Sequence, residues 1–353
     1  MKAAPMALTL TDLTAPEGFE RLVLAEAPEA GLRALICLHS TALGPAAGGC
    51  RMWSYADDAA AIQDVTRLAR GMTHKNAMAD LGLGGGKAVI IGDAAIDKTP
   101  RMMRAFGEAV EALEGRYWTA EDVGISPEDM AHAAEATRFA VGLSGASGDP
   151  SPWTAEGVFR CLQTGAGHVF GTADLTGRRV LVQGLGHVGL SLAEKLAKAG
   201  ARLTLTDINS TALQAAARRL GATVCAPDAV FDQPVEIFAP CALGGVLTDQ
   251  TAQDLSASLI CGAANNQLAH DGVAGALAAR GITYLPDYVV NAGGIISVAS
   301  EIHGKPDAWR LERLTAIAGR VGDMLARAAQ TGRAPAEVAD EMVAAMLSPR
   351  RAA

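Results

Sequence analysis

The pattern of apolar and polar residues divides the chain near residue 150. Before that point, short apolar runs and stretches with apolar side chains every three or four residues predict a mixture of strands and helices. One predicted helix has Pro100 in its first turn and Gly115 just past its end, which are common start and stop signals. The elements predicted for this part are strands over residues 32–39 and 87–92 and helices over residues 57–70 and 99–113.

Beyond residue 150, strands and helices alternate regularly. Such alternation predicts a parallel sheet with helices on both faces. Residues 307–330 carry apolar side chains on one stripe, which predicts a long amphipathic helix. The other elements predicted here are strands over residues 179–183, 202–207, 235–238 and 259–262 and helices over residues 153–170, 188–198 and 210–220.

Residues 143–153 are rich in Gly, Ser and Pro and form the predicted linker between two domains. Two domains are also expected because 353 residues exceed what one hydrophobic core usually supports. We predict an α/β protein whose first domain covers residues 1–145 and whose second covers 146–329. The long helix is expected to lead the chain back, so that residues from about 330 to 353 join the first domain.

Composition narrows the possible partners. A formal net charge of −8 and a pI near 5.4 provide no basic surface for nucleic acid or an anionic membrane. Six cysteines are scattered without the close pairing of metal sites or secreted disulfide frameworks, so we expect reduced, mostly buried thiols and no metal. The N-terminus has no signal-peptide pattern, and no run reaches the roughly 18 apolar residues of a membrane helix. We therefore expect a cytoplasmic protein with a small-molecule partner.

A glycine motif follows the first strand predicted beyond residue 150. Gly184, Gly186 and Gly189 form the Gly-X-Gly-X-X-Gly fingerprint of dinucleotide-binding domains, with His187 and Val188 in between. In this motif the first glycine allows a tight turn, the second a close approach to a pyrophosphate, and the third close packing of the helix. The motif and the alternating elements together predict a Rossmann-like, doubly wound dinucleotide-binding domain.

Asp207 ends the strand after this motif, twenty-three residues beyond Gly184. A carboxylate at that place accepts hydrogen bonds from a ribose diol and repels a 2′-phosphate, which favours NAD over NADP. A structural alternative is that Asp207 caps the N-terminus of the following helix. We interpret His187 as a solvent-facing residue without a catalytic role.

Two lysines lie among small residues in the first part of the chain. Lys75 and Lys87 are twelve positions apart, and Asp122 follows within Thr119-Ala120-Glu121-Asp122-Val123-Gly124. A single isolated lysine would be interpreted as a salt-bridge partner, whereas two in such surroundings favour chemistry. A lysine near low-dielectric walls and another cation has a lowered pKa and can act as a base, while the second lysine holds a carboxylate.

These motifs together resemble the Glu/Leu/Phe/Val amino-acid dehydrogenase family, and most of all its leucine and phenylalanine dehydrogenase branch. The resemblance implies reversible, NAD-dependent oxidative deamination of an L-amino acid to a 2-oxo acid and ammonium. It also implies an N-terminal domain for substrate binding and oligomerisation, and a homo-oligomer such as a dimer or an octamer. The similar segments keep the family's order and comprise residues 43–49, 71–87, 119–124, 184–189, 239–242, 263–266 and 291–294.

The resemblance implies roles for individual residues. Lys75 would bind the substrate α-carboxylate, assisted by the backbone at Gly48 and Gly49. Lys87 would be the base that activates the attacking water, and Asp122 would carry protons to the departing amine.

At the cofactor, Thr154 and Asn265 would orient the nicotinamide, and Asp207 would bind the adenosine ribose. Asn291 would line the cleft between the domains. The remaining residues implied at the cofactor are Gly184, Gly186, His187, Val188, Gly189, Ala239 and Cys241.

The implied side-chain pocket is apolar. Glutamate-specific relatives have a cation at the position of Ala47, and leucine-type relatives generally have Leu there, so Ala47 leaves a roomier pocket that favours an aromatic side chain. Ile295 and Val298 are branched and shorten the pocket again. Because one methylene discriminates by only about 1 to 3 kcal/mol, we favour leucine and other branched-chain acids and keep phenylalanine as the alternative.

Two other functions were weighed against this one. A catalytically silent NAD-binding regulator would have lost reactive groups, but all of them are present. A hydroxy-acid dehydrogenase would require a His and Arg pair in the site, and the sequence offers no such arrangement.

Overall fold

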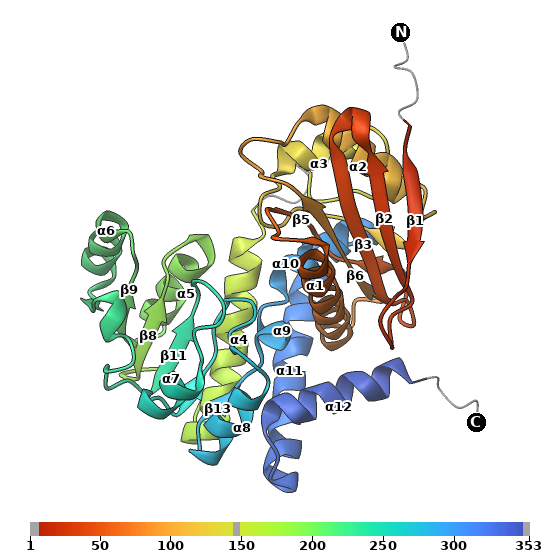
Figure 1. Ribbon diagram of the computed structural model, residues 1–353. Coiled ribbons are helices and arrows are strands. Elements are labelled where there is room, and N and C mark those ends of the chain that lie inside the picture. The colour runs from red at the N-terminus through yellow and green to blue at the C-terminus, as the bar shows by residue number, and fades with distance from the viewer. Residues whose placement is uncertain (1–6, 144–148, 349–353) are drawn as a thin grey trace. The chain divides into compact units, whose positions relative to one another are not determined.

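The computed structural model describes residues 7–143 and 149–348 and divides into two compact units (Figure 1). The first unit contains Met1–Gly148, Ser297–Pro306 and Met346–Ala353, and the second contains Asp149–Ile296 and Asp307–Ala345. The two-domain α/β fold is therefore confirmed. Within the described ranges, every helix is too short or too polar to cross a membrane.

The first unit is built on a seven-stranded sheet with the order β1-β2-β3-β6-β4-β7, and β5 pairs with β6 outside this path. Neighbours from β1 to β6 are antiparallel, whereas β4 and β5 run parallel to β6, and β7 runs parallel to β4. The strands are β1 Thr9–Leu13, β2 Arg21–Ala27, β3 Leu32–Ser40, β4 Ala46–Ala47, β5 Cys50–Trp53, β6 Gly84–Ile91 and β7 Tyr117–Trp118. The helices are α1 Asp58–Ala79, α2 Pro100–Glu111 and α3 Pro127–Ala134, with a short 3₁₀ turn at Pro28–Ala30.

Two helices cover opposite faces of this sheet, which explains why its central strands are largely apolar on both faces. Leu35 and Val89 belong to the core under α1, whereas Ile36 and Ile90 belong to the core under α2. Successive strand residues point to opposite faces, so Lys87, two residues before Val89, lies on the α1 face. The fold thus directs a lysine into a buried layer.

The helix predicted over residues 57–70 continues in the structure to Ala79. Its last turns bury the polar residues Thr73 and Asn76 beside apolar ones, so the apolar spacing of the helix becomes irregular there although the helix continues. The strand predicted from Lys87 likewise begins earlier, at Gly84. Glycine has a low strand propensity, but here the strand is fixed by its neighbours in the sheet.

The second unit contains a six-stranded sheet with the order β10-β9-β8-β11-β12-β13, and all its pairs are parallel, as predicted. Leu259 faces α4 at Gly165, whereas the next residue, Ile260, joins the core that includes Val273 and Leu277 of α8. Helices therefore cover both faces. The strands are β8 Arg179–Gln183, β9 Arg202–Thr206, β10 Thr223–Val224, β11 Ile237–Pro240, β12 Leu259–Ile260 and β13 Thr283–Tyr284. The helices are α4 Ser151–Phe170, α5 His187–Lys198, α6 Ser210–Leu220, α7 Asp249–Asp254, α8 Gly272–Ala279, α9 Asp287–Val290, α10 Gly293–Ile302, α11 Asp307–Thr331 and α12 Pro335–Leu347, with a 3₁₀ turn at Pro227–Ala229.

The C-terminal segment differs from the expectation that residues 330–353 join the first domain. Residues 307–345 group with the second unit, because α11 packs along α4 and Ala336 of α12 packs on the second unit's core. A hydrogen bond of 2.7 Å from Tyr288 Oη to Asp340 Oδ1 also ties α12 to α9. The segment of α10 from Ser297 and the chain from Met346 group with the first unit instead.

Part of the predicted linker, residues 144–148, lies outside the described residues. All six cysteines are free thiols, and four of them are buried, as predicted.

Candidate active site and cofactor site

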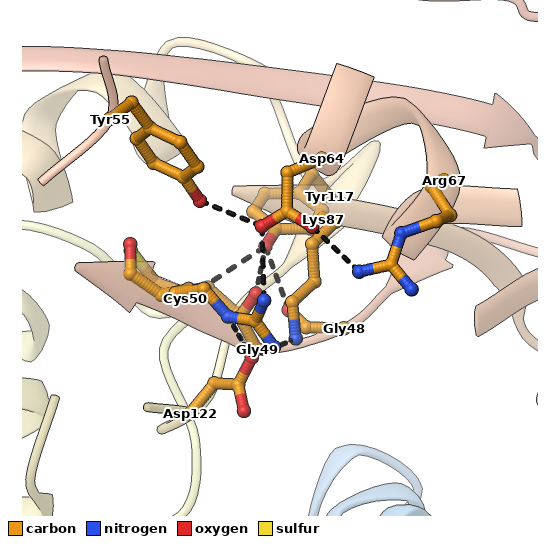
Figure 2. A network of polar contacts seen from close by, with 11 residues as sticks. Gly48, Gly49, Cys50, Tyr55, Asp64, Arg67, Lys87, Tyr117 and Asp122 are labelled. Carbon is orange, nitrogen blue, oxygen red and sulfur yellow. Dashed lines mark hydrogen bonds and ion pairs between the residues drawn. The ribbon is translucent and has the colours of Figure 1, made fainter. Parts of the chain in front are cut away.

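Lys87 and Asp122 form an ion pair in the first unit, in which Lys87 is buried and Asp122 is half-buried (Figure 2). Lys87 Nζ lies 2.6 Å from Asp122 Oδ2, and only 6% of Lys87 is exposed. Charges this close and this poorly hydrated interact far more strongly than a surface pair. The structure therefore brings together the two residues that the sequence predicted for proton transfer.

The loop that carries Asp122 is fixed from two sides. Met52 of β5 donates its backbone N–H to Val123 O at 2.9 Å, and Lys98 Nζ donates to Gly124 O at 2.8 Å. Gly124 has a φ of +80°, and a Cβ there would lie 2.4 Å from Met52 O. A glycine is required at this turn, and the turn sets the position of the carboxylate.

Neighbouring charges control the ionisation of Asp122. Burial favours the neutral carboxyl group, but Lys87 and Arg51 outweigh it, so the pKa of Asp122 lies below its ordinary value. Arg51 Nε lies 3.5 Å from Asp122 Oδ2, the oxygen that Lys87 also approaches. Asp122 is consequently a carboxylate at neutral pH.

The glycines around the lysines serve close packing between α1 and β6. A Cβ on Gly85 would lie 2.1 Å from Thr73 N, so the helix backbone rests directly on the strand. Thr73 and Gly85 each precede one of the two lysines, Lys75 and Lys87, by two residues. The buried amide of Asn76 adds hydrogen bonds of 3.2 and 2.5 Å to the backbones of β4 and β6. This contact fixes the two elements that carry the lysines, and Lys75 itself is half-buried.

Ala47, Gly48 and Gly49 continue the glycine-rich layer. Ala47 is completely buried, and a Cβ on Gly48 would lie 2.0 Å from Gly86 O. The N–H of Gly48 donates to Trp118 O at 3.1 Å, so it is already used within the sheet. The N–H of Gly49 makes no hydrogen bond to any residue that the structure describes. The role implied for the backbone at Gly48 and Gly49 in carboxylate binding stays a prediction.

A charged network behind Asp122 was not predicted from the sequence. Arg51 Nη1 lies 3.0 Å from Asp64 Oδ2, which also accepts a hydrogen bond of 2.8 Å from Tyr55 Oη. Arg67 Nη2 donates to Asp64 Oδ1 at 2.8 Å. Figure 2 shows Tyr55, Asp64 and Arg67 of this network together with Lys87 and Asp122. The sequence contained one signal for this network. Arg51 is the charged residue in the otherwise uncharged segment of residues 46–53, which includes β5.

In the second unit, two of the three motif glycines are required by the protein's own packing. Gly184 has a φ of +92°, and its Cβ would lie 2.8 Å from Ala242 Cβ. A Cβ on Gly189 would lie 2.0 Å from Gly184 O. A Cβ on Gly186, in contrast, would meet no described atom within 4 Å. The packing of the described residues therefore does not itself require glycine at Gly186, at the start of α5.

Asp207 stands at the end of β9, beside the glycine loop. Its Oδ2 accepts a hydrogen bond of 2.6 Å from Leu185 N, and its Oδ1 accepts one of 2.7 Å from Asn209 N. The helix that follows is capped by Asn209, whose side chain accepts from Ala212 N. The alternative interpretation of Asp207 as the helix cap is therefore wrong.

The other residues predicted around the cofactor loop have different surroundings. The side chain of His187 is 86% exposed, which agrees with a solvent-facing residue. Val188 is half-buried in α5, and Ala239 is buried in β11. Cys241 donates its backbone N–H to Gln183 O at 2.7 Å, and burial raises the pKa of its thiol to about 12. Cys241 is therefore a neutral packing residue against the loop.

The structure brings two predicted asparagines together. Asn291 is 5% exposed, and its Nδ2 donates to Asn265 Oδ1 at 2.8 Å and to Ala263 O at 3.1 Å. Asn265 is exposed. A buried amide thus holds an exposed one in place.

Thr154 lies in the first turn of α4, where its hydroxyl donates to Pro150 O at 3.3 Å. A Cβ on Gly293 would lie 2.4 Å from Thr154 N, so the start of α10 is packed directly on the start of α4. Ile295 and Val298 follow on α10, and both are half-buried. Ile295 belongs to the second unit and Val298 to the first.

Comparisons with known proteins agree with this arrangement. Residues 20–139 match a family model described as Glu/Leu/Phe/Val dehydrogenase, dimerisation domain, and residues 207–345 match the Glutamate/Leucine/Phenylalanine/Valine dehydrogenase model. The chain is 47% identical over 310 residues to leucine dehydrogenase of Bacillus subtilis (strain 168), covering 87% of this chain and 85% of that one. It is 45% identical over 335 residues to a valine dehydrogenase of Streptomyces coelicolor, covering 92% and 91% of the two chains.

The fold also matches solved structures. The crystal structure of L-tryptophan dehydrogenase from Nostoc punctiforme is similar with a TM-score of 0.84 and 36% identity, over 94% of this chain and 96% of that one. Both halves of the chain and both sites thus point to one group of proteins, and the chain belongs to the Glu/Leu/Phe/Val dehydrogenase family of amino-acid dehydrogenases.

Proposed function

We propose that this protein catalyses the reversible, NAD-dependent oxidative deamination of leucine and other branched-chain L-amino acids to 2-oxo acids and ammonium. The observation that carries the proposal is the ion pair of 2.6 Å between Lys87 and Asp122. Deamination needs a base and a proton carrier at one place, and this buried pair provides both.

The chemistry assigns a step to each member of the pair. Loss of a hydride from Cα leaves an iminium, which water attacks to give a carbinolamine that then releases ammonia. Lys87 accepts the proton of the attacking water, and Asp122 passes a proton to the departing amine. Because Lys87 is nearly inaccessible to bulk solvent, protons move between the pair and the substrate instead of leaking to water.

Lys75 is proposed to bind the substrate α-carboxylate, together with the backbone N–H of Gly49. A fixed cation at the carboxylate orients Cα for hydride loss, which lowers the entropic barrier of the reaction. Lys75 suits this role because the packing of Thr73 on Gly85 holds its helical turn on the strand that carries Lys87.

The substrate side chain is proposed to be aliphatic. Ala47 is buried and uncharged, so it offers no partner for a side-chain carboxylate. Ile295 and Val298 provide branched, half-buried surface for a branched side chain. Leucine and valine dehydrogenases among the relatives support the same substrate class.

Dehydrogenases of this family use a nicotinamide dinucleotide, and we propose NAD over NADP. No described atom lies within 4 Å of a Cβ at Gly186, so a pyrophosphate has space to approach the backbone there. The N-terminal amides of α5 are suitable donors to it. Asp207 already accepts two N–H groups, yet a carboxylate has about four acceptor sites and keeps capacity for a ribose diol. Its negative charge disfavours a 2′-phosphate. Bound NAD supplies the hydride acceptor.

Thr154 and Asn265 are assigned to the nicotinamide end of the cofactor. The hydrogen bond of 2.8 Å from Asn291 orients the exposed amide of Asn265, which is what recognition of a carboxamide requires. Asn291 therefore acts through Asn265.

We further propose a cytoplasmic homo-oligomer. The match of residues 20–139 to a dimerisation domain supports self-association. Light scattering of the purified protein, coupled to size-exclusion chromatography, tests this directly, and a monomer at micromolar concentration would contradict it.

The test of the function is a substrate panel in both directions with NAD and NADP. We expect leucine, isoleucine and valine to give the highest kcat/KM with NAD, and phenylalanine and glutamate to be poorer. A higher kcat/KM for phenylalanine would establish the alternative substrate. Binding of NAD in calorimetry without turnover of any amino acid would establish a silent regulator and reject the proposal.

A further inference from the structure

Asp122 faces two cations, although its ion pair needs only one. Lys87 Nζ and Arg51 Nε lie 2.6 and 3.5 Å from the same oxygen, Oδ2. They come from adjacent parallel strands, because β5 pairs with β6. The second cation, Arg51, is needed if Lys87 loses its positive charge during the reaction.

Arg51 keeps an unused hydrogen-bond donor near this oxygen. Its buried Nε–H makes no hydrogen bond to the described residues, since 3.5 Å is longer than a normal N–H···O bond. A small shift of the carboxylate would convert the contact into a direct hydrogen bond. Asp122 can therefore exchange one partner for the other without leaving its loop.

Arg51 is itself held firmly in place. Its Nη1 lies 3.0 Å from Asp64 Oδ2, and the side chain of Asp64 is only 17% exposed. Asp64 is fixed in turn by hydrogen bonds from Tyr55 and Arg67, each of 2.8 Å (Figure 2). These contacts hold the Arg51 guanidinium in place when Lys87 or the substrate moves.

The other titratable groups facing Asp122 cannot supply a charge. Cys50 lies on β5 and Tyr117 on β7, and burial raises the pKa of both, so both are neutral at any pH at which the enzyme works. Arg51 carries a guanidinium, which takes no part in the proton transfer. It is the cation beside Asp122 whose charge does not change during turnover.

We propose that Arg51 is a positioning residue that keeps Asp122 ionised while Lys87 is deprotonated. This inference rests on the proposed function of the Lys87–Asp122 pair. When Lys87 releases its proton, the buried carboxylate loses its nearest counter-ion, and without Arg51 it would take up a proton from water. With Arg51 present, Asp122 remains a carboxylate that can accept a proton from the substrate ammonium and return it to the departing amine.

The pH profile of kcat/KM for leucine tests the inference. Arg51→Gln removes the charge and should move the acid limb of the profile upward by about one pH unit, because the carboxylate is then more easily protonated. Arg51→Lys restores a cation and should restore the wild-type limb to within about 0.3 units, whatever its effect on kcat. Arg104→Gln is the matched control, since Arg104 forms an exposed ion pair with Glu135 in the same unit. An unmoved acid limb in Arg51→Gln would overturn the inference.

A second measurement does not depend on turnover. Thermal unfolding at pH 7 is compared for Lys87→Ala, Arg51→Gln and the double variant. Each single variant leaves Asp122 one cation, whereas the double variant leaves a buried carboxylate with neither. The loss of Tm in the double variant should exceed the sum of the single losses, and additive losses would contradict the inference. If the wild type deaminated no amino acid, the proposed function would fail, while this thermal cycle would still decide the role of Arg51.

Discussion

Glycines surround both sites of this protein, but they serve different purposes in the two units. In the first unit, a Cβ on Gly48 or Gly85 would lie 2.0 or 2.1 Å from backbone atoms, so the fold itself demands glycine. In the second unit, Gly186 meets no described atom within 4 Å. The glycines of the first site are therefore required by packing, whereas the second site has a glycine that the packing of the described residues does not require.

The charged residues of the two sites also differ in their burial and in their partners. Lys87 is 6% exposed and paired with Asp122 inside a packed layer. Asp207 is half-buried, and its described partners are backbone N–H groups of the surrounding turns. Proton transfer benefits from buried, coupled charges, while cofactor binding needs donors and acceptors that a large ligand can reach.

The largest expected effect comes from removing the buried charge of the first site. Lys87→Ala should lower kcat for leucine by about 100- to 10,000-fold, because the general base is lost. Arg51 still neutralises Asp122 in this variant, so the fold should survive. Steady-state kinetics and circular dichroism are measured beside Lys305→Ala, an exposed lysine, as control. Turnover within tenfold of wild type would remove Lys87 from its proposed role.

A glycine substitution on β6, where the strand packs against α1, should be nearly as damaging, but by lowering the stability of the fold. Gly85→Ala places a methyl group 2.1 Å from Thr73 N and should cost about 3 kcal/mol, since helix and strand must separate. Gly71→Ala, in the same helix, meets no described atom within 4 Å and should stabilise by about 0.5 to 1 kcal/mol. Urea unfolding of both variants measures the difference. Equal stabilities would show that this contact does not constrain the fold.

The glycine loop of the second unit should separate binding from stability. Gly186→Ala should weaken NAD binding by about tenfold, roughly 1.4 kcal/mol, while leaving Tm unchanged. Gly189→Ala should lower both, because its Cβ would lie 2.0 Å from Gly184 O. Calorimetric titration with NAD and thermal unfolding distinguish these outcomes. Unchanged NAD affinity in Gly186→Ala would mean that the loop does not approach the pyrophosphate.

The second unit follows from its sequence more closely than the first. Its helix over residues 210–220 was predicted with the bounds that α6 shows, and the structure has local end signals there, with Asn209 as N-cap and Gly221 as C-cap. In the first unit, β4 and β7 contain two residues each, and their pairing depends on long-range contacts that no local pattern records. The regular alternation of strands and helices can be predicted from the sequence, whereas the strand pairing of a mixed sheet is harder to predict.

The same limit applies to the first site. Lys87 and Asp122 stood out in the sequence because both lie among glycines. Arg51 did not, because its importance depends on Asp64 and Asp122, which lie 13 and 71 positions away and meet it only in the folded sheet. Residue type and spacing can identify reactive groups, but the groups that control their charge come from tertiary packing.

The smallest expected effect concerns acid sensitivity, which should originate in the first unit. Burial lowers the pKa of His39 to about 4, with contributions from His74 and Arg70, and its Nδ1 lies 2.8 Å from Thr73 Oγ1 under α1. The unfolded chain binds a proton near pH 6.5, so the folded state binds fewer protons between pH 4 and 6.5. The stability from neutral His39 is fully present above pH 6.5 and is lost as the pH falls toward 4.

His39→Gln should therefore flatten the fall of Tm between pH 6.5 and 4.5. Because His39 is half-buried, the effect is discounted to about 1 kcal/mol, or about 3 °C in Tm. His270→Gln is the matched control in the second unit, where the side chain is 55% exposed and pairs with Asp249. Its profile should parallel that of the wild type. If both variants kept the wild-type slope, acid sensitivity would not come from His39. The Lys87–Asp122 pair alone would then support the contrast between a first site that depends on charged side chains and a second site that depends on backbone N–H groups.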